Sequence, residues 1–415
     1  MVRQTKLVLL LILTSITAAT ANGFSQRDII ANLLRENPRL QAARAKWAAM
    51  KKRVPQARAW DDPMAGVDVE RMGTTKFNTF TDNEWMLSQS LPITGKNLVR
   101  GRIANAEALA TFEELRRVEL DLVARARAAH ARLAGAYEKL AITSRSEEVL
   151  KQFAEITRAK YEAGIQTQSD LLIAQTDLAR IAETRSQIER DISDQQTQLN
   201  VLMNRRASSP ITLSTTLNFT SLRVARTRIE AFALENRPEV ILAARGVEAE
   251  KSRRDLAKRQ WIPDPQVRIE ARQFNGSGIS EYDTGVFFSV PWPNYAKYSA
   301  GEGEATSSLE RARREHEAAR TEVLGLVRDQ LKKIEVTEQN YRLFTESLVP
   351  LANQALQSTR SSYESDKTGF LELLTARRTL QEVESTALQH LVDHEVALAE
   401  LDAIIGQHAR KESQK

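Results

Sequence analysis

The sequence predicts a mainly α-helical protein with a small β part, built on an internal twofold repeat and extended into a barrel of long helical hairpins. Three observations support this fold class. Residues 161–204 align without a gap on residues 363–406. Two stretches keep helical periodicity for roughly 65 residues each, which is about 100 Å of helix and more than a compact domain needs. Four short segments alternate apolar and charged residues, as strands with two different faces do.

The first element, residues 1–21, is expected to be a cleaved secretory signal peptide. Arg3 and Lys6 give it a positive start, residues 7–16 form an apolar run, and Ala19-Thr20-Ala21 offers a cleavage site. The apolar run is too short to cross a bilayer, which takes about 20 residues. The chain contains no cysteine, which excludes disulfides, thiolate metal sites and a lipid anchor at Cys. We therefore expect an exported protein.

The first repeat is expected to cover residues 22–204. Its elements are a helix, two strands and the two arms of a long hairpin over 96–204, at 25–58, 64–71, 83–91, 96–162 and 168–204. In the first arm, apolar residues recur at spacings of three and four with Arg and Glu between them, and alanines alternate with leucines. This pattern is typical of closely packed coiled coils. Residues 205–226, rich in Ser, Thr and β-branched residues, break the pattern and link the repeats.

The second repeat is expected to cover residues 227–406, before a charged tail at 407–415. It has the same order of elements, with a hairpin over 297–406, at 227–259, 266–273, 284–291, 297–364 and 370–406. A similar motif precedes the first strand of each repeat: Trp60-Asp61-Asp62-Pro63 in the first and Trp261-Ile262-Pro263-Asp264-Pro265 in the second. A repeat of this length lies outside the solenoid periods of about 20–50 residues, so it indicates a duplicated module.

The strand segments indicate contact with a membrane. Val267, Ile269 and Ala271 alternate with charged residues, which gives the strand one apolar and one charged face. Tryptophans are expected at the ends of the strand pairs, namely Trp60, Trp85, Trp261 and Trp292. Alternating strands with aromatic residues at their ends are typical of transmembrane β-barrels. Two β-hairpins that cap a helical bundle are the alternative.

A sheet of four strands cannot lie in lipid by itself, because every backbone group there must be paired. The smallest outer-membrane barrels have about eight strands. Any membrane role would therefore need a barrel completed by several copies of the chain. Two copies and three copies both satisfy this requirement, and the periodicity does not choose between them.

Several short motifs occur in a specific order along both repeats. They are the helix starts, the segment that joins a strand to the first long helix, and the two hairpin turns: Asn37-Pro38, Arg237-Pro238, Ser88-Gln89-Ser90-Leu91-Pro92-Ile93-Thr94-Gly95-Lys96, Tyr161-Glu162-Ala163-Gly164 with Asp170-Leu171-Leu172, and Tyr363 with Glu372-Leu373-Leu374-Thr375-Ala376. With these motifs the mature chain resembles the TolC-like outer-membrane efflux protein family, the outer-membrane factors of tripartite efflux systems. The Ser-Gln-x-Leu-Pro-x-x-Gly-Lys segment is most similar to the heavy-metal efflux branch.

The resemblance implies a homotrimer with a twelve-stranded barrel in the outer membrane of a Gram-negative bacterium and a helical tunnel through the periplasm. It implies a passive channel that is not an enzyme and uses no cofactor. Its expected partners are outer-membrane lipid, a periplasmic adaptor (membrane fusion protein) and an inner-membrane pump of the RND type. Metal cations, drugs and secreted proteins remain open as solutes, with metal cations favoured. A periplasmic coiled-coil adaptor or scaffold, and the outer-membrane duct of a protein secretion system, are the alternative functions.

The resemblance also implies roles at the hairpin tips. Glu372 falls on the first acidic position that closes the periplasmic end in the family, Thr375 stands where a second carboxylate is usual, and Asp170 is the equivalent of Glu372 in the first repeat. Three copies of Glu372 around a narrow axis would form a ring that favours cations; a solvated helix residue is the alternative. The turns are expected to dock the adaptor through Gly164, Ile165, Gln166, Thr167, Lys367, Thr368 and Gly369.

Other kinds of site find little support. His390 and His394 lie four residues apart on a helix and could share a metal, but no third ligand accompanies them, so a packing role is favoured. No Ser-His-Asp constellation or zinc-protease motif is present, so neither a catalytic nor a metal site is predicted. The net charge of +5 falls to +3 once Arg3 and Lys6 leave with the signal peptide, which gives no case for nucleic acid.

Overall fold

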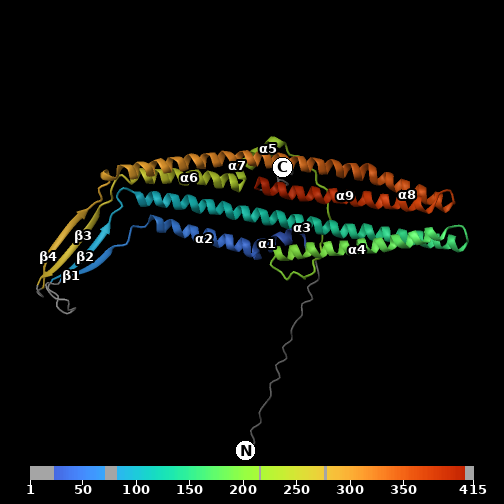
Figure 1. The fold of residues 1–415 in the computed structure, drawn as a ribbon, viewed down its shortest axis with the longest axis horizontal. Helices are drawn as coiled ribbons and strands as arrows, with labels where there is room; N and C mark the ends of the chain where they lie inside the picture. Colours follow the sequence, from blue (N-terminus) through green and yellow to red (C-terminus); the bar gives the residue numbers. More distant parts are fainter. Residues whose placement is uncertain (1–22, 71–81, 215, 275–277, 407–415) are drawn as a thin grey trace, which may run out of the picture.

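The computed structural model describes residues 23–70, 82–214, 216–274 and 278–406. They form a long rod with a small sheet at one end and two helical turns at the other (Figure 1). The elements of the first repeat are α1 Gln26–Glu36, α2 Pro38–Arg58, β1 Met64–Glu70, β2 Asp82–Ser90, α3 Lys96–Glu162 and α4 Gln168–Leu202. Those of the second are α5 Arg226–Asn236, α6 Pro238–Arg259, β3 Gln266–Phe274, β4 Ile279–Phe287, α7 Tyr295–Leu343, α8 Val349–Glu364 and α9 Phe370–Ile405.

Two helices predicted as continuous are each divided in two. The break between α1 and α2 falls at Asn37, whose side chain accepts hydrogen bonds from the amides of Arg39 and Leu40. The break between α5 and α6 falls at Arg237. In both cases a proline follows, and a residue before proline is sterically pushed out of the helical region. Both prolines therefore start a new helix, as prolines at the first helical position do.

The second long helix is also interrupted, unlike α3, which is continuous over its predicted range. A π-helical turn at Phe344–Leu348 separates α7 from α8. Pro350 lies just beyond it and has no amide hydrogen to donate to the carbonyl of Glu346. An extra residue in one turn of helix relieves the clash of the proline ring with the preceding turn.

The four strands form one antiparallel sheet in the order β1-β2-β3-β4. β4 lies at Ile279–Phe287, about five residues before the predicted 284–291. Its position follows from the register, because Phe287 pairs with Gln266, the first residue of β3, and no strand continues beyond that pair. The other three strands begin within two residues of their predicted starts.

The two faces of the sheet differ as the alternation predicts. One cross-strand row consists of Val67, Trp85, Ala271 and Tyr282. This apolar face is open, since Val67 is 61% exposed and Tyr282 is 71% exposed. On the other face Arg272 forms ion pairs with Glu84 and Asp283, at 3.3 and 3.7 Å. The sheet therefore presents an uncovered hydrophobic surface.

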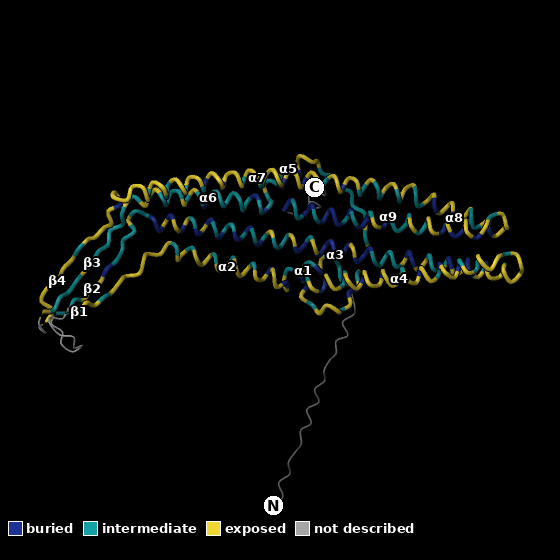
Figure 2. The backbone as a smooth tube through the Cα atoms, viewed as in Figure 1, coloured by how far each residue is buried: buried dark blue, intermediate teal, exposed yellow. Residues whose placement is uncertain are grey.

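The helices form a wall in which α3 is central. Towards the sheet α3 lies between α2 and α6, and towards the tips it lies between α4 and α9 (Figures 1 and 2). Buried residues follow α3 and α9, whereas α2, α4 and α7 are largely exposed (Figure 2). The linker crosses this wall near its middle, where the Tyr137 hydroxyl donates to the carbonyl of Ile211. In the described part of the chain no helix is long and apolar enough to span a membrane.

Candidate functional site

The candidate site is the end of the rod opposite the sheet, where the α3–α4 turn and the α8–α9 turn lie side by side (Figure 1). The structure places all the predicted docking residues in these two turns: Gly164, Ile165, Gln166, Thr167, Lys367, Thr368 and Gly369. The turns have different internal structures, and only one of them is held by the neighbouring hairpin.

The first turn is built on a left-handed glycine. Gly164 has φ +72°, a conformation that costs a side-chain-bearing residue energy. The amide of Ile165 donates to the carbonyl of Lys160 at 2.9 Å, which closes the end of α3. Thr167 then caps α4 by accepting a hydrogen bond from the amide of Asp170. Ile165 is 60% exposed, so this turn presents an apolar side chain to solvent.

The second turn is held by a lysine from the first hairpin. Lys160 of α3 donates a hydrogen bond to the carbonyl of Tyr363 at 2.8 Å and forms an ion pair with Asp366. Its ammonium also lies 4.4 Å from the centre of the Tyr363 ring. Asp366 has φ +55°, a conformation that aspartate tolerates better than most residues. Lys160 therefore adds a hydrogen bond to a carbonyl at the end of α8 that otherwise accepts only from the amides of the turn, such as that of Asp366 at 3.2 Å.

Tyr363 anchors this tip in the core. It is 1% exposed, and its hydroxyl lies 3.0 Å from that of buried Thr157 on α3. Phe370, Leu373 and Leu374 at the start of α9 are buried in the same cluster, together with residues of α3 and α4. The second tip is thus packed onto the first hairpin.

A buried charge network ties α9 to the first hairpin a little further from the turns. Asp177 of α4, whose side chain is 3% exposed, forms ion pairs with Arg377 at 3.5 Å and with Arg378. Arg377 also donates to the hydroxyl of Ser146 on α3 at 2.6 Å. Burial lowers the pKa of the Arg377 guanidinium, while the hydrogen bond with Asp177 raises that of Arg378.

Sequence reasoning did not identify this network. A signal was present, however, because Asp177 lies between Ala174 and Ile181 at the three-and-four spacing of a coiled-coil seam, and both neighbours are buried. A charged residue at a seam position must be paired or leave the core. Arg377 follows Leu373 and Leu374 in the same way.

The predicted aperture residues occupy the first turns of α9 and α4. Glu372 and Thr375 are exposed and line a cavity of about 410 Å³ between α8 and α9. Asp170 instead accepts a hydrogen bond from the Thr167 hydroxyl at 2.7 Å, so its carboxylate is engaged in the cap of α4. Within the described residues no hydrogen bond or ion pair engages Glu372. Its carboxylate is therefore available to solvent and solutes.

The tryptophans lie at the sheet end, with one correction. Trp60 and Trp292, 59% and 64% exposed, lie where the sheet meets the helices. Trp261 lies there too and packs against Tyr295 and Tyr298, with ring centres 5.4 and 5.3 Å away. Trp85 was predicted at a strand end but lies inside β2, opposite Val67 of β1.

The two histidines of α9 do not share a ligand. The Nε2 of His394 lies 2.8 Å from the carbonyl of Thr220 in the linker, and its ring packs on Phe219. His390 packs edge-on against Phe344 at 5.1 Å. Across the residues that the structure describes, no cluster of His, Asp and Glu could hold a metal ion.

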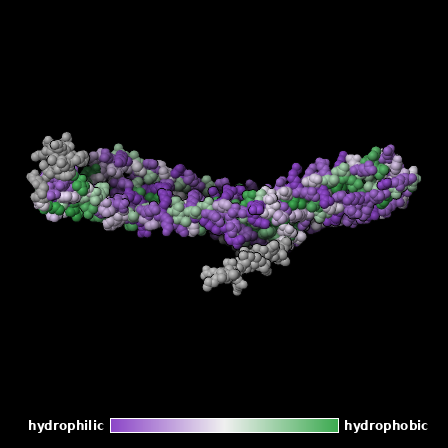
Figure 3. All heavy atoms as spheres, turned by 90° about the horizontal axis from the view of Figure 1, so that it is seen from below, coloured by the Kyte–Doolittle hydropathy of each residue, from purple (hydrophilic) through white to green (hydrophobic). Residues whose placement is uncertain are grey.

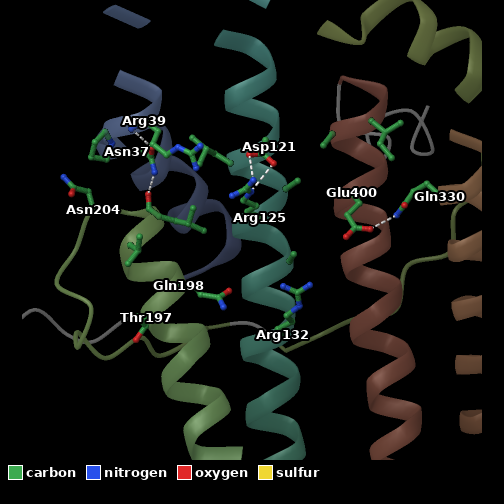
Figure 4. A pocket seen from close by; sticks show the side chains of 18 residues that line it. Asn37, Arg39, Asp121, Arg125, Arg132, Thr197, Gln198, Asn204, Gln330 and Glu400 are labelled. Atoms are coloured by element: carbon green, nitrogen blue, oxygen red, sulfur yellow. Dashed lines mark hydrogen bonds and ion pairs between the residues drawn. The ribbon is translucent and has the colours of Figure 1, made fainter. Parts of the chain in front are cut away.

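A cavity of about 980 Å³ lies at the waist between α3, α4 and α9 (Figure 4). Its polar rim carries the ion pair of Arg125 with Asp121 and the hydrogen bond from Gln330 to Glu400.

The sequence matches the family described as outer membrane efflux protein over residues 29–205 and 232–407, once for each repeat. The fold is similar to a membrane protein from Pseudomonas aeruginosa, with a TM-score of 0.79, 16% identity and coverage of 92% of this chain and 93% of that chain. For the outer membrane protein VceC from Vibrio cholerae the values are 0.79, 18%, 92% and 96%. For CusC they are 0.76, 17%, 92% and 92%. A comparison with curated proteins gives no match.

Proposed function

The chain belongs to the outer membrane efflux protein family, and from this premise we propose that three copies form a passive duct across the outer membrane and the periplasm. The copies would close their sheets into a twelve-stranded barrel and their hairpins into a tunnel. The duct would receive solutes from an inner-membrane pump, of the RND type, through a periplasmic adaptor. In this proposal the duct itself catalyses no reaction during transport.

The observation that carries the proposal is the sheet. Its apolar face is uncovered, and its edge strands β1 and β4 have no further partner among the described residues. In lipid each unpaired backbone group would cost several kcal/mol. Pairing β4 of one copy with β1 of the next would remove both edges and place the apolar face against lipid.

The tips support the assignment of the periplasmic end. The helical wall separates the tips from the sheet. The turns at the tips expose residues such as Ile165 and Lys367, which an adaptor would contact. The free carboxylate of Glu372 lies beside these turns. Three such carboxylates would favour cations at the narrowest point, so metal cations are the solutes that we propose first.

Planar-bilayer conductance of the purified full chain tests the duct. We expect discrete channels with a preference for cations, and a weaker preference in the Glu372→Ala variant. Glu189→Ala is the matched control, because it removes an exposed carboxylate in the middle of α4. Loss of selectivity only in Glu372→Ala would support the aperture.

The two parts of the proposal fail separately. A chain that inserts into bilayers without forming channels would contradict the duct. Channels whose cation preference is the same in wild type and in Glu372→Ala would contradict only the role of Glu372. Chemical cross-linking in detergent checks the copy number, for which we expect a trimer.

A further inference from the structure

A basic groove lies where the helical wall meets the sheet. It encloses about 830 Å³ between α2, α3 and α6, and each of these helices contributes one arginine, namely Arg58, Arg102 and Arg259. The acidic residue of its lining is Glu248. Arg259 donates to the carbonyl of Thr94, and Arg102 approaches Asp255 at 3.7 Å while its side chain stays 56% exposed. The groove therefore carries a net positive charge.

Arg58 is seated by a glycine. A Cβ at Gly101 would lie 2.0 Å from Cγ of Arg58, so the stem of the arginine rests directly on the backbone of α3. In the described part of the chain no hydrogen bond or ion pair engages its guanidinium. The arginine is thus positioned by packing and left with all its donors open, which suits an anionic oxygen ligand.

An entirely basic helix flanks the groove only on the side of the first repeat. Every charged residue of α2 is basic: Arg39, Arg44, Lys46, Lys51, Lys52, Arg53 and Arg58. Its equivalent in the second repeat, α6, carries acidic residues as well: Glu239, Glu248, Glu250 and Asp255. α2 buries only one stripe, against α3, so most of these cationic groups face solvent.

An aromatic and apolar band adjoins the groove on the sheet side. Trp60 follows Arg58 by two residues, and Trp261 with its tyrosine partners lies at the same junction. Ile93, in the turn before α3, is 75% exposed. Leu98, in the first turn of α3, is 53% exposed and lines the groove itself. In Figure 3 hydrophobic residues gather at both ends of the rod, this one included, with a largely hydrophilic middle between them.

From the sheet to the groove, the order of these regions matches the order of layers in one leaflet of a bilayer. The apolar sheet face corresponds to the acyl chains, the tryptophans to the interface, and the arginines to the phosphate level. We propose that the groove of Arg58, Arg102 and Arg259 binds the headgroup of an anionic phospholipid in the periplasmic leaflet of the outer membrane. The inference rests on the proposed function, because it requires the sheet to lie in that membrane. A free phosphate ion would use the arginines but not the exposed Ile93, Leu98 and Trp60.

Native mass spectrometry of the detergent-solubilised full chain, titrated with phosphatidylglycerol or phosphatidylcholine, tests the site. We expect preferential retention of phosphatidylglycerol, reduced about fivefold by Arg58→Gln and by Arg102→Gln, since each surface cation contributes about that factor to anionic lipid binding. Both arginines are exposed, so the variants should fold. Arg44→Gln is the control, because it removes one positive charge of α2 outside the groove.

A second pair of variants keeps every charge. Gly101→Ala should displace the stem of Arg58 and reduce retention, whereas Gly303→Ala, on α7 with open space around it, should not. Equal retention of the two lipids, an equal loss in Arg44→Gln, or full competition by millimolar inorganic phosphate would each overturn the lipid site.

The outcomes also separate this inference from the duct. Discrete channels together with no preference for phosphatidylglycerol would contradict the lipid site and leave the duct intact. Specific retention of phosphatidylglycerol by a protein that forms no channels would support the lipid site and contradict the duct.

Discussion

The two tips of the molecule have related sequences and different environments. Tyr161 and Tyr363 occupy equivalent positions in the repeat, yet the first is 40% exposed and the second 1%. Leu172 and Leu374 are likewise equivalent, with exposures of 53% and 0%. The two repeats therefore have the same residue types at these positions, and the position of each hairpin in the wall determines which of the two side chains is buried.

The reason is the central position of α3. The second tip packs onto α3 through Tyr363 and through Lys160, so its anchor residues are covered within one chain. The first tip has α4 on its outer side, and nothing in the described chain covers that side of it. In the proposed trimer the second hairpin of a neighbouring copy would lie there. The second tip is thus fixed by contacts within the chain, whereas the first tip keeps an uncovered side for contact with a partner.

Truncating the two tyrosines should give the largest difference. Tyr363→Ala removes a fully buried ring and its contact with Thr157, so we expect a loss of about 3–5 kcal/mol of stability at this tip. Tyr161→Ala should stay within about 0.5 kcal/mol, because the ring is partly exposed. Hydrogen exchange of the amides in 363–374 and in 161–172 measures both. Equal protection losses in the two variants would remove the distinction between the tips.

Breaking the buried charge network should have the next largest effect. Asp177→Asn leaves Arg377 buried without a carboxylate, which costs about 3 kcal/mol for a buried pair. The control is Glu189→Gln, whose exposed pair with Arg185 contributes less than about 1 kcal/mol. Urea unfolding of the solubilised protein, with hydrogen exchange in α4 and α9, is the measurement.

A double variant sharpens this test. If Asp177 and Arg377 act as a pair, Asp177→Asn combined with Arg377→Met should be less destabilised than the sum of the two single variants, because no uncompensated charge stays buried. Simple additivity would mean that Asp177 stabilises the tip only through the exposed Arg378.

The architecture followed from the sequence because it depends on periodicity. The range of α3, the antiparallel strand pairs and the alternation of Val267, Ile269 and Ala271 with charged residues were all predictable from residues close in sequence. The breaks before Pro38 and Pro238 fall inside the ranges 25–58 and 227–259, which were predicted as continuous because helical periodicity continues across both, although Asn37-Pro38 and Arg237-Pro238 were recognised as helix starts. The π-helical turn before Pro350 was missed for the same reason.

The candidate site was less predictable because it depends on contacts between distant segments. The turn residues could be placed, since a turn is a local feature. Lys160 holding Asp366, and Asp177 holding Arg377, join residues about 200 positions apart, and a repeat alone does not show which face of one hairpin meets the other. The role of Glu372 in a ring remains a prediction, because it depends on further copies of the chain.

The smallest predicted difference concerns the turns themselves. Gly164→Ala forces an alanine into the left-handed region and should cost about 1 kcal/mol. Gly369→Ala should cost less, about 0.5 kcal/mol, because φ there is −78° and the space around it is open, while alanine is a poorer N-cap for α9 than glycine. Hydrogen exchange of the two turns compares these values. A cost at Gly369 similar to that at Gly164 would mean that the second turn needs a glycine for a reason other than its backbone angles, such as close contact with a partner.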